Sequence, residues 1–143
     1  LYDDETLDRQ TKKAREMADC VIVSIHWGVE DNFKPNADQK RKAKLMADNG
    51  VDVIIGHHPH VLQPLEWIDR ADGGKTLCMY SLGNFLSGMM YSRNMVGGIL
   101  GFDISFRLSA RIITTCAALR YTAFRNIQMR SNRRTAHIHS NRP

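Results

Sequence analysis

Three histidines within four positions are the clearest chemical feature of this chain. They lie in the segment Gly56-His57-His58-Pro59-His60, directly after the apolar run at 51–55. Neutral imidazole is the commonest metal ligand in proteins. Polar side chains beside a buried strand lose contact with water, and this loss costs free energy unless a hydrogen bond or a metal ion replaces the water. We therefore predict that this loop binds a metal ion, and a loop held only by hydrogen bonds is the alternative.

A fourth histidine, His26, follows a second apolar run at 21–25. The two runs and the helical pattern between them predict a βαβ unit over residues 20–55, long enough for a right-handed parallel crossover. Parallel strands end at the same edge of a sheet, where open α/β sheets place ligands. We therefore expect His26 to join the later histidines, although it could instead cap its own strand.

Several polar residues lie close to these histidines in the sequence. Glu30 and Asp31 are either metal ligands, partners that orient an imidazole, or solvated loop charges. Asn84 follows a Ser-Leu-Gly turn and either orients substrate, binds metal through its amide oxygen, or satisfies its own turn. Gln63 and Glu66 would line the pocket, unless their strand simply alternates polar and apolar side chains.

The remaining elements follow from charge and hydropathy patterns. Residues 3–19 read as a helix with acidic residues at its start, and Asn36 caps a second helix that ends before Gly50. Further strands are expected at 61–68, 76–81 and 96–106, with a loop at 86–94. The order of elements predicts an α/β fold with a mixed sheet or a sandwich. Phosphate-loop, dinucleotide and nucleophile-elbow motifs are absent from the sequence.

Composition divides the chain into two parts. The chain has 143 residues, about one domain, no apolar run long enough to span a membrane, and three scattered cysteines that do not predict disulfides. Residues 1–103 hold 12 basic and 15 acidic residues, whereas 104–143 hold eight arginines and no acid. The tail at 107–143 either binds nucleic acid or an acidic polymer, or is irregular or non-native sequence, such as a misread frame. We favour the second reading, because the tail lacks periodicity and has too few aromatics to stack on nucleic acid.

Three ordered motifs resemble one known family. They are VIVSIHWGVE at 21–30, GVDVIIGHHPHVLQPLE at 50–66 and YSLGNF at 80–85. Together they resemble the bacterial poly-γ-glutamate capsule biosynthesis (CapA-type) family, which is grouped with the calcineurin-like metallophosphoesterases. The resemblance covers about residues 10–106. It implies that residues 1–106 are the C-terminal half of a metallophosphoesterase-like β-sandwich with flanking helices.

The resemblance also implies a set of site residues. His26, His57 and His60 would be ligands of a divalent metal (Mn, Fe or Zn), with Asn84 as a further catalytic residue. The usual late motif has one residue between its histidines, so His58 could take the place of His57. The family's acidic and asparagine–histidine ligands lie upstream, and no such motif precedes His26 in this sequence. The resemblance thus implies about half of a two-metal site, in a fragment expected to be inactive alone.

Two functions follow from the resemblance. The first is a metal-dependent hydrolase-like domain in poly-γ-glutamate capsule biosynthesis, acting on an anionic polymer or a phosphoester. The alternative is a non-catalytic assembly or export component that binds the polymer beside other capsule proteins. In either case the family implies a location at the cell envelope, although the sequence itself contains no membrane segment.

Overall fold

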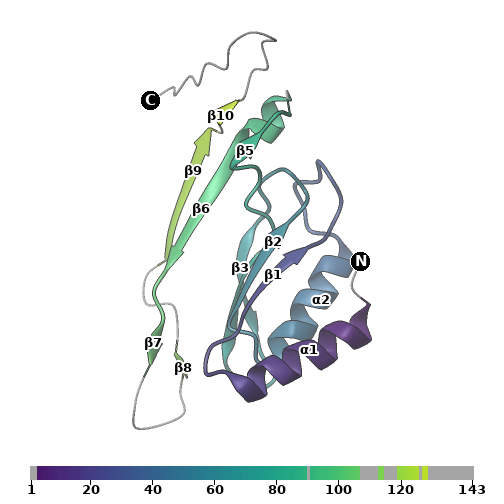
Figure 1. Ribbon diagram of the computed structural model, residues 1–143, viewed down its shortest axis with the longest axis vertical. Coiled ribbons are helices and arrows are strands. Elements are labelled where there is room, and N and C mark those ends of the chain that lie inside the picture. The colour runs from purple at the N-terminus through teal and green to yellow at the C-terminus, as the bar shows by residue number, and fades with distance from the viewer. Residues whose placement is uncertain (1–2, 90, 107–112, 115–118, 126, 129–143) are drawn as a thin grey trace.

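The structure is a computed structural model that describes residues 3–89, 91–106, 113–114, 119–125 and 127–128 (Figure 1). Its helices are α1 (Asp4–Met17), α2 (Ala37–Asp48) and the 3-10 helix η1 (Ser92–Met95). Its strands are β1 (Ile22–His26), β2 (Val53–His57), β3 (Leu65–Asp69), β4 (Lys75–Met79), β5 (Leu86–Ser87), β6 (Val96–Phe102), β7 (Ser105–Phe106), β8 (Ile113–Thr114), β9 (Leu119–Arg125) and β10 (Ile127–Gln128). The chain therefore has a mixed α/β fold, as the sequence predicts.

Both α-helices begin where the sequence predicts. The Asp3 side chain caps α1 by accepting the backbone N–H of Thr6 at 2.7 Å. Asn36 and Gln39 form a capping box at the start of α2, in which each side chain accepts a hydrogen bond from the other's backbone N–H. Gly50, with φ 85°, follows the end of α2 in the left-handed conformation that glycine tolerates best. Within the described residues, every helix is too short or too polar to span a bilayer.

Four strands form one sheet in the order β1-β2-β4-β3. Strands β1 and β2 are parallel, with register running from Ile22↔Val53 to His26↔His57. Strand β4 is parallel to β2, and β3 is antiparallel to β4. The predicted βαβ unit is therefore confirmed as β1–α2–β2, and its two strands end side by side in histidine.

The hydrophobic core lies between this sheet and the two helices. Figure 1 shows α1 and α2 together on one side of the sheet. Alternate strand residues point toward them, and they pack with the inner faces of the helices; the core includes Leu7, Ile25, Ala43, Met46, Ile54, Cys78 and Tyr80. Burial of apolar surface contributes about 25 cal/mol per Å², so the packing in this layer stabilises the framework that carries the strand ends.

The rest of the described chain forms two-stranded ribbons. Strand β6 pairs antiparallel with β9 along its length, and β5 pairs with β10. A bridge between Gly83 and Gly97 ties β6 to the turn after β4. Of the β-sandwich that the resemblance implies, the described residues hold one four-stranded sheet and these ribbons. Strands β8, β9 and β10 lie within 107–143, and β9 pairs with β6. The expectation that this tail is irregular or non-native sequence stays a prediction. The other tail residues lie outside the described residues.

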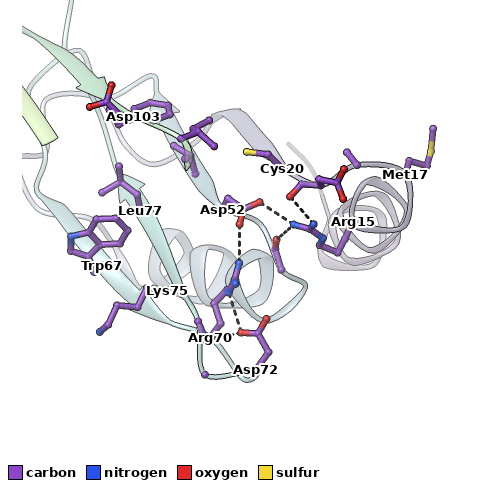
Figure 2. A pocket seen from close by; sticks show the side chains of 18 of the residues that line it. Arg15, Met17, Cys20, Asp52, Trp67, Arg70, Asp72, Lys75, Leu77 and Asp103 are labelled. Atoms are coloured by element: carbon purple, nitrogen blue, oxygen red, sulfur yellow. Dashed lines mark hydrogen bonds and ion pairs between the residues drawn. The ribbon is translucent and has the colours of Figure 1, made fainter. Parts of the chain in front are cut away.

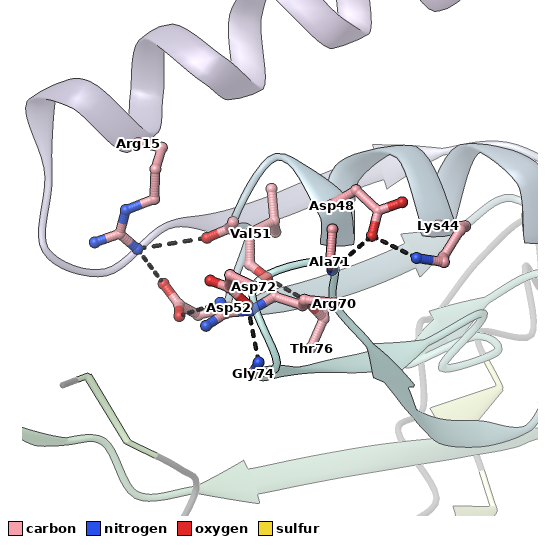
Figure 3. A network of polar contacts seen from close by, with 11 residues as sticks. Arg15, Lys44, Asp48, Val51, Asp52, Arg70, Ala71, Asp72, Gly74 and Thr76 are labelled. Atoms are coloured by element: carbon pink, nitrogen blue, oxygen red, sulfur yellow. Dashed lines mark hydrogen bonds and ion pairs between the residues drawn. The ribbon is translucent and has the colours of Figure 1, made fainter.

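A network of ion pairs and hydrogen bonds stabilises the end of the sheet where β1 and β2 begin (Figure 3). The Asp52 carboxylate accepts hydrogen bonds from Arg15 at 3.0 Å, Arg70 at 3.1 Å and the backbone N–H of Val21 at 2.8 Å. Arg70 also contacts Asp72 at 3.1 Å. These contacts join α1, β1, β2 and the turn after β3, so one largely buried carboxylate holds the amino ends of β1 and β2 together.

Candidate metal centre

The candidate site lies at the carboxyl ends of β1 and β2. His26 and His57 are the last residues of these strands and face each other in register. The chain then leaves both strands as loops, and the backbone N–H of Trp27 donates to the carbonyl of His57 at 3.1 Å. The predicted convergence of the two histidine segments at one sheet edge is therefore observed.

Three side chains bring potential metal donors together in these loops. One ligand atom each of Glu30, His58 and His60 lies within 4.8 Å of the others. The ring of His26 stands next to them, with its centroid 4.5 Å from that of His58. Donors bound to one Zn²⁺ at about 2.0–2.2 Å lie within about 4.4 Å of each other. The spacing of the three donors is therefore close to the spacing that one divalent ion requires.

The loop backbone is strained where it presents these donors. His58 has φ 99° and His60 φ 58°, and Asp31, next to Glu30, has φ 59°. Non-glycine residues in the left-handed region cost about 1–3 kcal/mol each and persist where the surroundings impose them. The backbone N–H of Asp31 donates to the carbonyl of Pro59 at 2.9 Å, which joins the two strained loops.

Close packing beneath the loops explains Gly56. The indole of Trp27 is 2% exposed and donates through Nε1 to the carbonyl of Tyr80 at 2.9 Å. A Cβ on Gly56 would stand 2.0 Å from that carbonyl oxygen and 2.4 Å from the indole nitrogen. Glycine is therefore required here so that β2 can pass between Trp27 and Tyr80 and deliver the histidines at the sheet edge.

Asn84 forms a hydrogen bond with the His60 ring that fixes which ring nitrogen carries the proton. Asn84 Nδ2 donates to the carbonyl of Asn94 at 3.2 Å, and a carbonyl only accepts, so this contact fixes the orientation of the amide. Asn84 Oδ1 then faces His60 Nδ1 at 2.7 Å and accepts its hydrogen. With the proton held on Nδ1, the Nε2 lone pair of His60 is available to a metal ion.

His57 has a different environment from its two neighbours. Its Nε2 lies 3.1 Å from Ser24 Oγ on the adjacent strand. Partial desolvation, together with the nearby charge of His26, lowers the pKa of His57 and favours neutral imidazole. In this structure, His58 lies with His60 and Glu30, whereas His57 lies beside His26. The one-residue spacing of His58 and His60 is the sequence signal for that pairing.

The structure places the other predicted residues outside the donor set. Gln63 is 4% exposed and donates to the carbonyl of Asn32 at 2.7 Å, while its Oε1 accepts from Gln39 at 2.8 Å. Gln63 thereby links the loop that contains Glu30 with Gln39 in the first turn of α2. Glu66 accepts a hydrogen bond from the Tyr80 hydroxyl at 2.5 Å. Both contacts support the framework around the site.

Sequence reasoning missed two residues of η1 that reach the site loops. Arg93 donates to Asp31 at 2.9 Å, and the Asn94 side chain donates to Asp31 at 2.7 Å and to the carbonyl of His60 at 3.2 Å. The Arg93 and Asn94 hydrogen bonds lower the pKa of Asp31 to about 2, so this carboxyl is ionised at neutral pH. The Ser-Arg-Asn segment has no spacing or motif that would have identified these contacts.

A separate cleft of about 970 Å³ lies at the opposite end of the sheet (Figure 2). Its walls include Trp67 and Leu77 from the sheet and Asp103 from the segment after β6, and the Asp52 ion pairs lie at its base. None of the four site histidines lines it. Within the part of the chain that the structure describes, the side chains close enough together to hold a metal ion are those of the histidine loops and not those of this cleft.

Comparison with known proteins agrees with this architecture. Residues 2–89 match the model of the family described as "Bacterial capsule synthesis protein PGA_cap". The chain is 34% identical over 113 residues to the "PGA biosynthesis protein CapA" of Bacillus subtilis (strain 168), covering 79% of this chain and 28% of that protein. It is 36% identical over 104 residues to the "Capsule biosynthesis protein CapA" of Bacillus anthracis, covering 70% of this chain and 24% of that protein. The chain thus spans about a quarter of the length of these relatives. With more than half of its residues matched by the family model, it belongs to the bacterial capsule synthesis protein PGA_cap family.

Proposed function

We propose that this chain supplies a metal-binding, hydrolase-like part of a protein of poly-γ-glutamate capsule biosynthesis. The observation that carries the proposal is the convergence of Glu30, His58 and His60 within 4.8 Å at the sheet edge, with His26 beside them. The names of the two relatives support the capsule context. Imidazole together with carboxylate suits Mn²⁺, Fe or Zn²⁺.

The residues of the chain would each contribute differently to such a centre. His60, with its proton held on Nδ1 by Asn84, presents Nε2 in a fixed tautomer. Glu30 brings negative charge, and His58 stands between His26 and His60. A bound divalent ion supplies Lewis acidity, which polarises a phosphoryl or amide carbonyl oxygen and lowers the pKa of a bound water. The expected substrate is therefore an anionic polymer or a phosphoester.

Metal binding by single-histidine variants tests the ligand assignment. We expect the purified chain to bind Mn²⁺ or Zn²⁺ in calorimetry. Each of His58→Ala and His60→Ala removes a ligand, so each should weaken binding by at least the roughly 10–100-fold that loss of a ligand-orienting partner costs. His57→Ala is the matched control, because His57 contacts Ser24. Equal affinity in all four proteins would refute the proposal. A loss in His57→Ala with none in His58→Ala would assign the ligand role to His57, as the resemblance first implies.

A polymer-binding role without turnover is the second candidate. It is favoured by the exposure of the site, because His26, Glu30 and His57 are all solvent-exposed. The discriminating experiment adds Mn²⁺ to a full-length protein that carries this segment, because the segment alone is expected to be inactive. It follows hydrolysis of a generic phosphoester alongside binding of poly-γ-glutamate. Hydrolysis that His60→Ala abolishes favours the hydrolase, whereas polymer binding without hydrolysis favours the second candidate.

A further inference from the structure

Asn94 joins three segments that surround the candidate metal centre. It lies in η1, and its side chain is fully buried. Its Nδ2 donates to Asp31 Oδ1 at 2.7 Å and to the carbonyl of His60 at 3.2 Å, while its own carbonyl accepts from Asn84 at 3.2 Å. A carboxylate and a carbonyl can only accept, so these contacts also fix the orientation of the Asn94 amide.

The two side-chain contacts of Asn94 fall on two of the three strained residues in the site loops. Asp31, with φ 59°, directly follows Glu30, and His60, with φ 58°, is itself a donor. Such backbone conformations persist only where the surroundings hold them. Asn94 bonds to the side chain of one residue and the carbonyl of the other, so a single amide ties both loops to η1.

We propose that Asn94 is a positioning residue of the metal centre, which fixes the separation of Glu30 and His60 by holding Asp31 and the His60 carbonyl. This inference rests on the proposed function. Asn94 lies beyond the residues that the family model matches, which end at 89. The assignment therefore extends the site to η1, a segment that the sequence motifs do not reach.

The chain offers a matched control in Asn49. Its Nδ2 donates to Asp8 Oδ1 at 2.9 Å and to Thr11 Oγ1 at 2.9 Å, and so it joins the end of α2 to α1. Both asparagines thus donate through the side-chain amide to an aspartate and to a second oxygen. Only Asn94 makes these contacts in the site loops, so Asn94→Ala and Asn49→Ala separate positioning of the donors from general stabilisation.

The first measurement is the affinity for Zn²⁺ by calorimetry, with Co²⁺ absorption as a report on donor geometry. Loss of a partner that orients a ligand typically weakens metal affinity about 10–100-fold. We expect a loss of that size and an altered Co²⁺ spectrum in Asn94→Ala, and neither in Asn49→Ala, although both variants unfold at a lower temperature. Asn94→Ser keeps one donor, is expected to lie between wild type and Asn94→Ala, and replaces Asn94→Ala if that variant does not fold.

The second measurement needs no metal. The Asp31 N–H donates to the Pro59 carbonyl at 2.9 Å, so its hydrogen exchange reports whether the two loops stay together. We expect Asn94→Ala to exchange this amide at least about 10-fold faster than wild type, and Asn49→Ala to leave it unchanged. Unchanged exchange in Asn94→Ala overturns the positioning role even if the wild type binds Zn²⁺. Faster exchange in a chain that binds no Zn²⁺ supports the positioning of the loops and refutes the proposed function instead.

Discussion

The two ends of the four-stranded sheet satisfy their polar groups in opposite ways. At the amino end, Asp52 is bonded to two arginines and a backbone N–H, and the chain there is joined by direct ion pairs. At the carboxyl end, His58 and His60 adopt strained backbone conformations and present donors toward Glu30. The first end stabilises the fold, whereas the second holds groups in a geometry that folding alone would not favour.

The cleft and the candidate metal centre lie at these two different ends of the sheet, so variants at each end should change different properties. Among the described residues, the group of side chains that could hold a metal ion lies at the exposed carboxyl end, whereas the cleft at the amino end is lined by the paired Asp52 and Arg70. Variants at the amino end should therefore change the free energy of unfolding without changing metal affinity. Variants at the carboxyl end should change metal affinity more than stability, except where they alter the packing beneath the loops.

The largest stability effect is expected from Asp52→Ala. The side chains of Asp52 and Arg70 are 14% and 11% exposed, so the substitution leaves a largely buried guanidinium without one of its carboxylates. Removing one partner of a buried pair costs about 3–5 kcal/mol. Urea unfolding measures this loss, with Asp69→Ala as the control, since its exposed pair with Lys75 should contribute less than about 1 kcal/mol. A similar loss in both variants, or reduced Zn²⁺ affinity in folded Asp52→Ala, would contradict the separation of the two ends.

Gly56→Ala should lower both the free energy of unfolding and the affinity for Zn²⁺. Its Cβ would collide with the Tyr80 carbonyl and the Trp27 indole, so strand β2 must shift near the histidines. Overpacking of this kind costs about 1–3 kcal/mol, and the shift should also weaken Zn²⁺ binding. Thermal unfolding and calorimetry measure the two effects. The control is Gly88→Ala, where a Cβ meets nothing within 4 Å and stability should change by less than about 0.5 kcal/mol. Normal stability in Gly56→Ala would show that the strand relaxes without cost.

Asn84→Ala should act on metal affinity with a smaller effect on stability. The substitution removes the acceptor that holds the proton on His60 Nδ1, so Zn²⁺ affinity is expected to fall about 10–100-fold. Asn36→Ala is the control, because it removes the cap of α2 and should cost about 1 kcal/mol of stability without changing affinity. Calorimetry on both variants tests this, and equal affinities in the two would exclude a role of Asn84 in orienting His60.

The sequence predicts the framework better than the site. Asn36 and Gly50 mark the limits of α2, and the β-branched runs around it predict the parallel strands, because these signals are local. Parallel topology then places His26 beside His57. The choice between His57 and His58 as the partner of His60 depends instead on backbone angles, which residue types do not specify.

The features that the sequence does not predict depend on contacts between residues far apart in the chain. Asn94 meets His60 across 34 positions and Asp31 across 63, and no periodicity links them. Strand β9 in the Arg-rich tail is likewise set by pairing with β6. The sequence predicts that Gln63 lines the pocket, whereas its hydrogen bonds to Asn32 and Gln39 depend on how α2 packs against the loop.

The smallest expected effect concerns the thiols, which report on the amino end. Burial raises the pKa of Cys78 far above its usual range, and partial burial with the nearby Asp52 charge raises that of Cys20. Because the thiolate is the reactive form, raised pKa values mean slower reaction at pH 8, with rates that increase as the pH rises. In a Cys116→Ser chain, we expect a thiol reagent to modify Cys20 several-fold more slowly than a small free thiol, and Cys78 only after unfolding. Rapid modification of both thiols at pH 8 would show that the amino end and the core beside it open readily, and that the ion pairs of Asp52 do not hold the sheet closed.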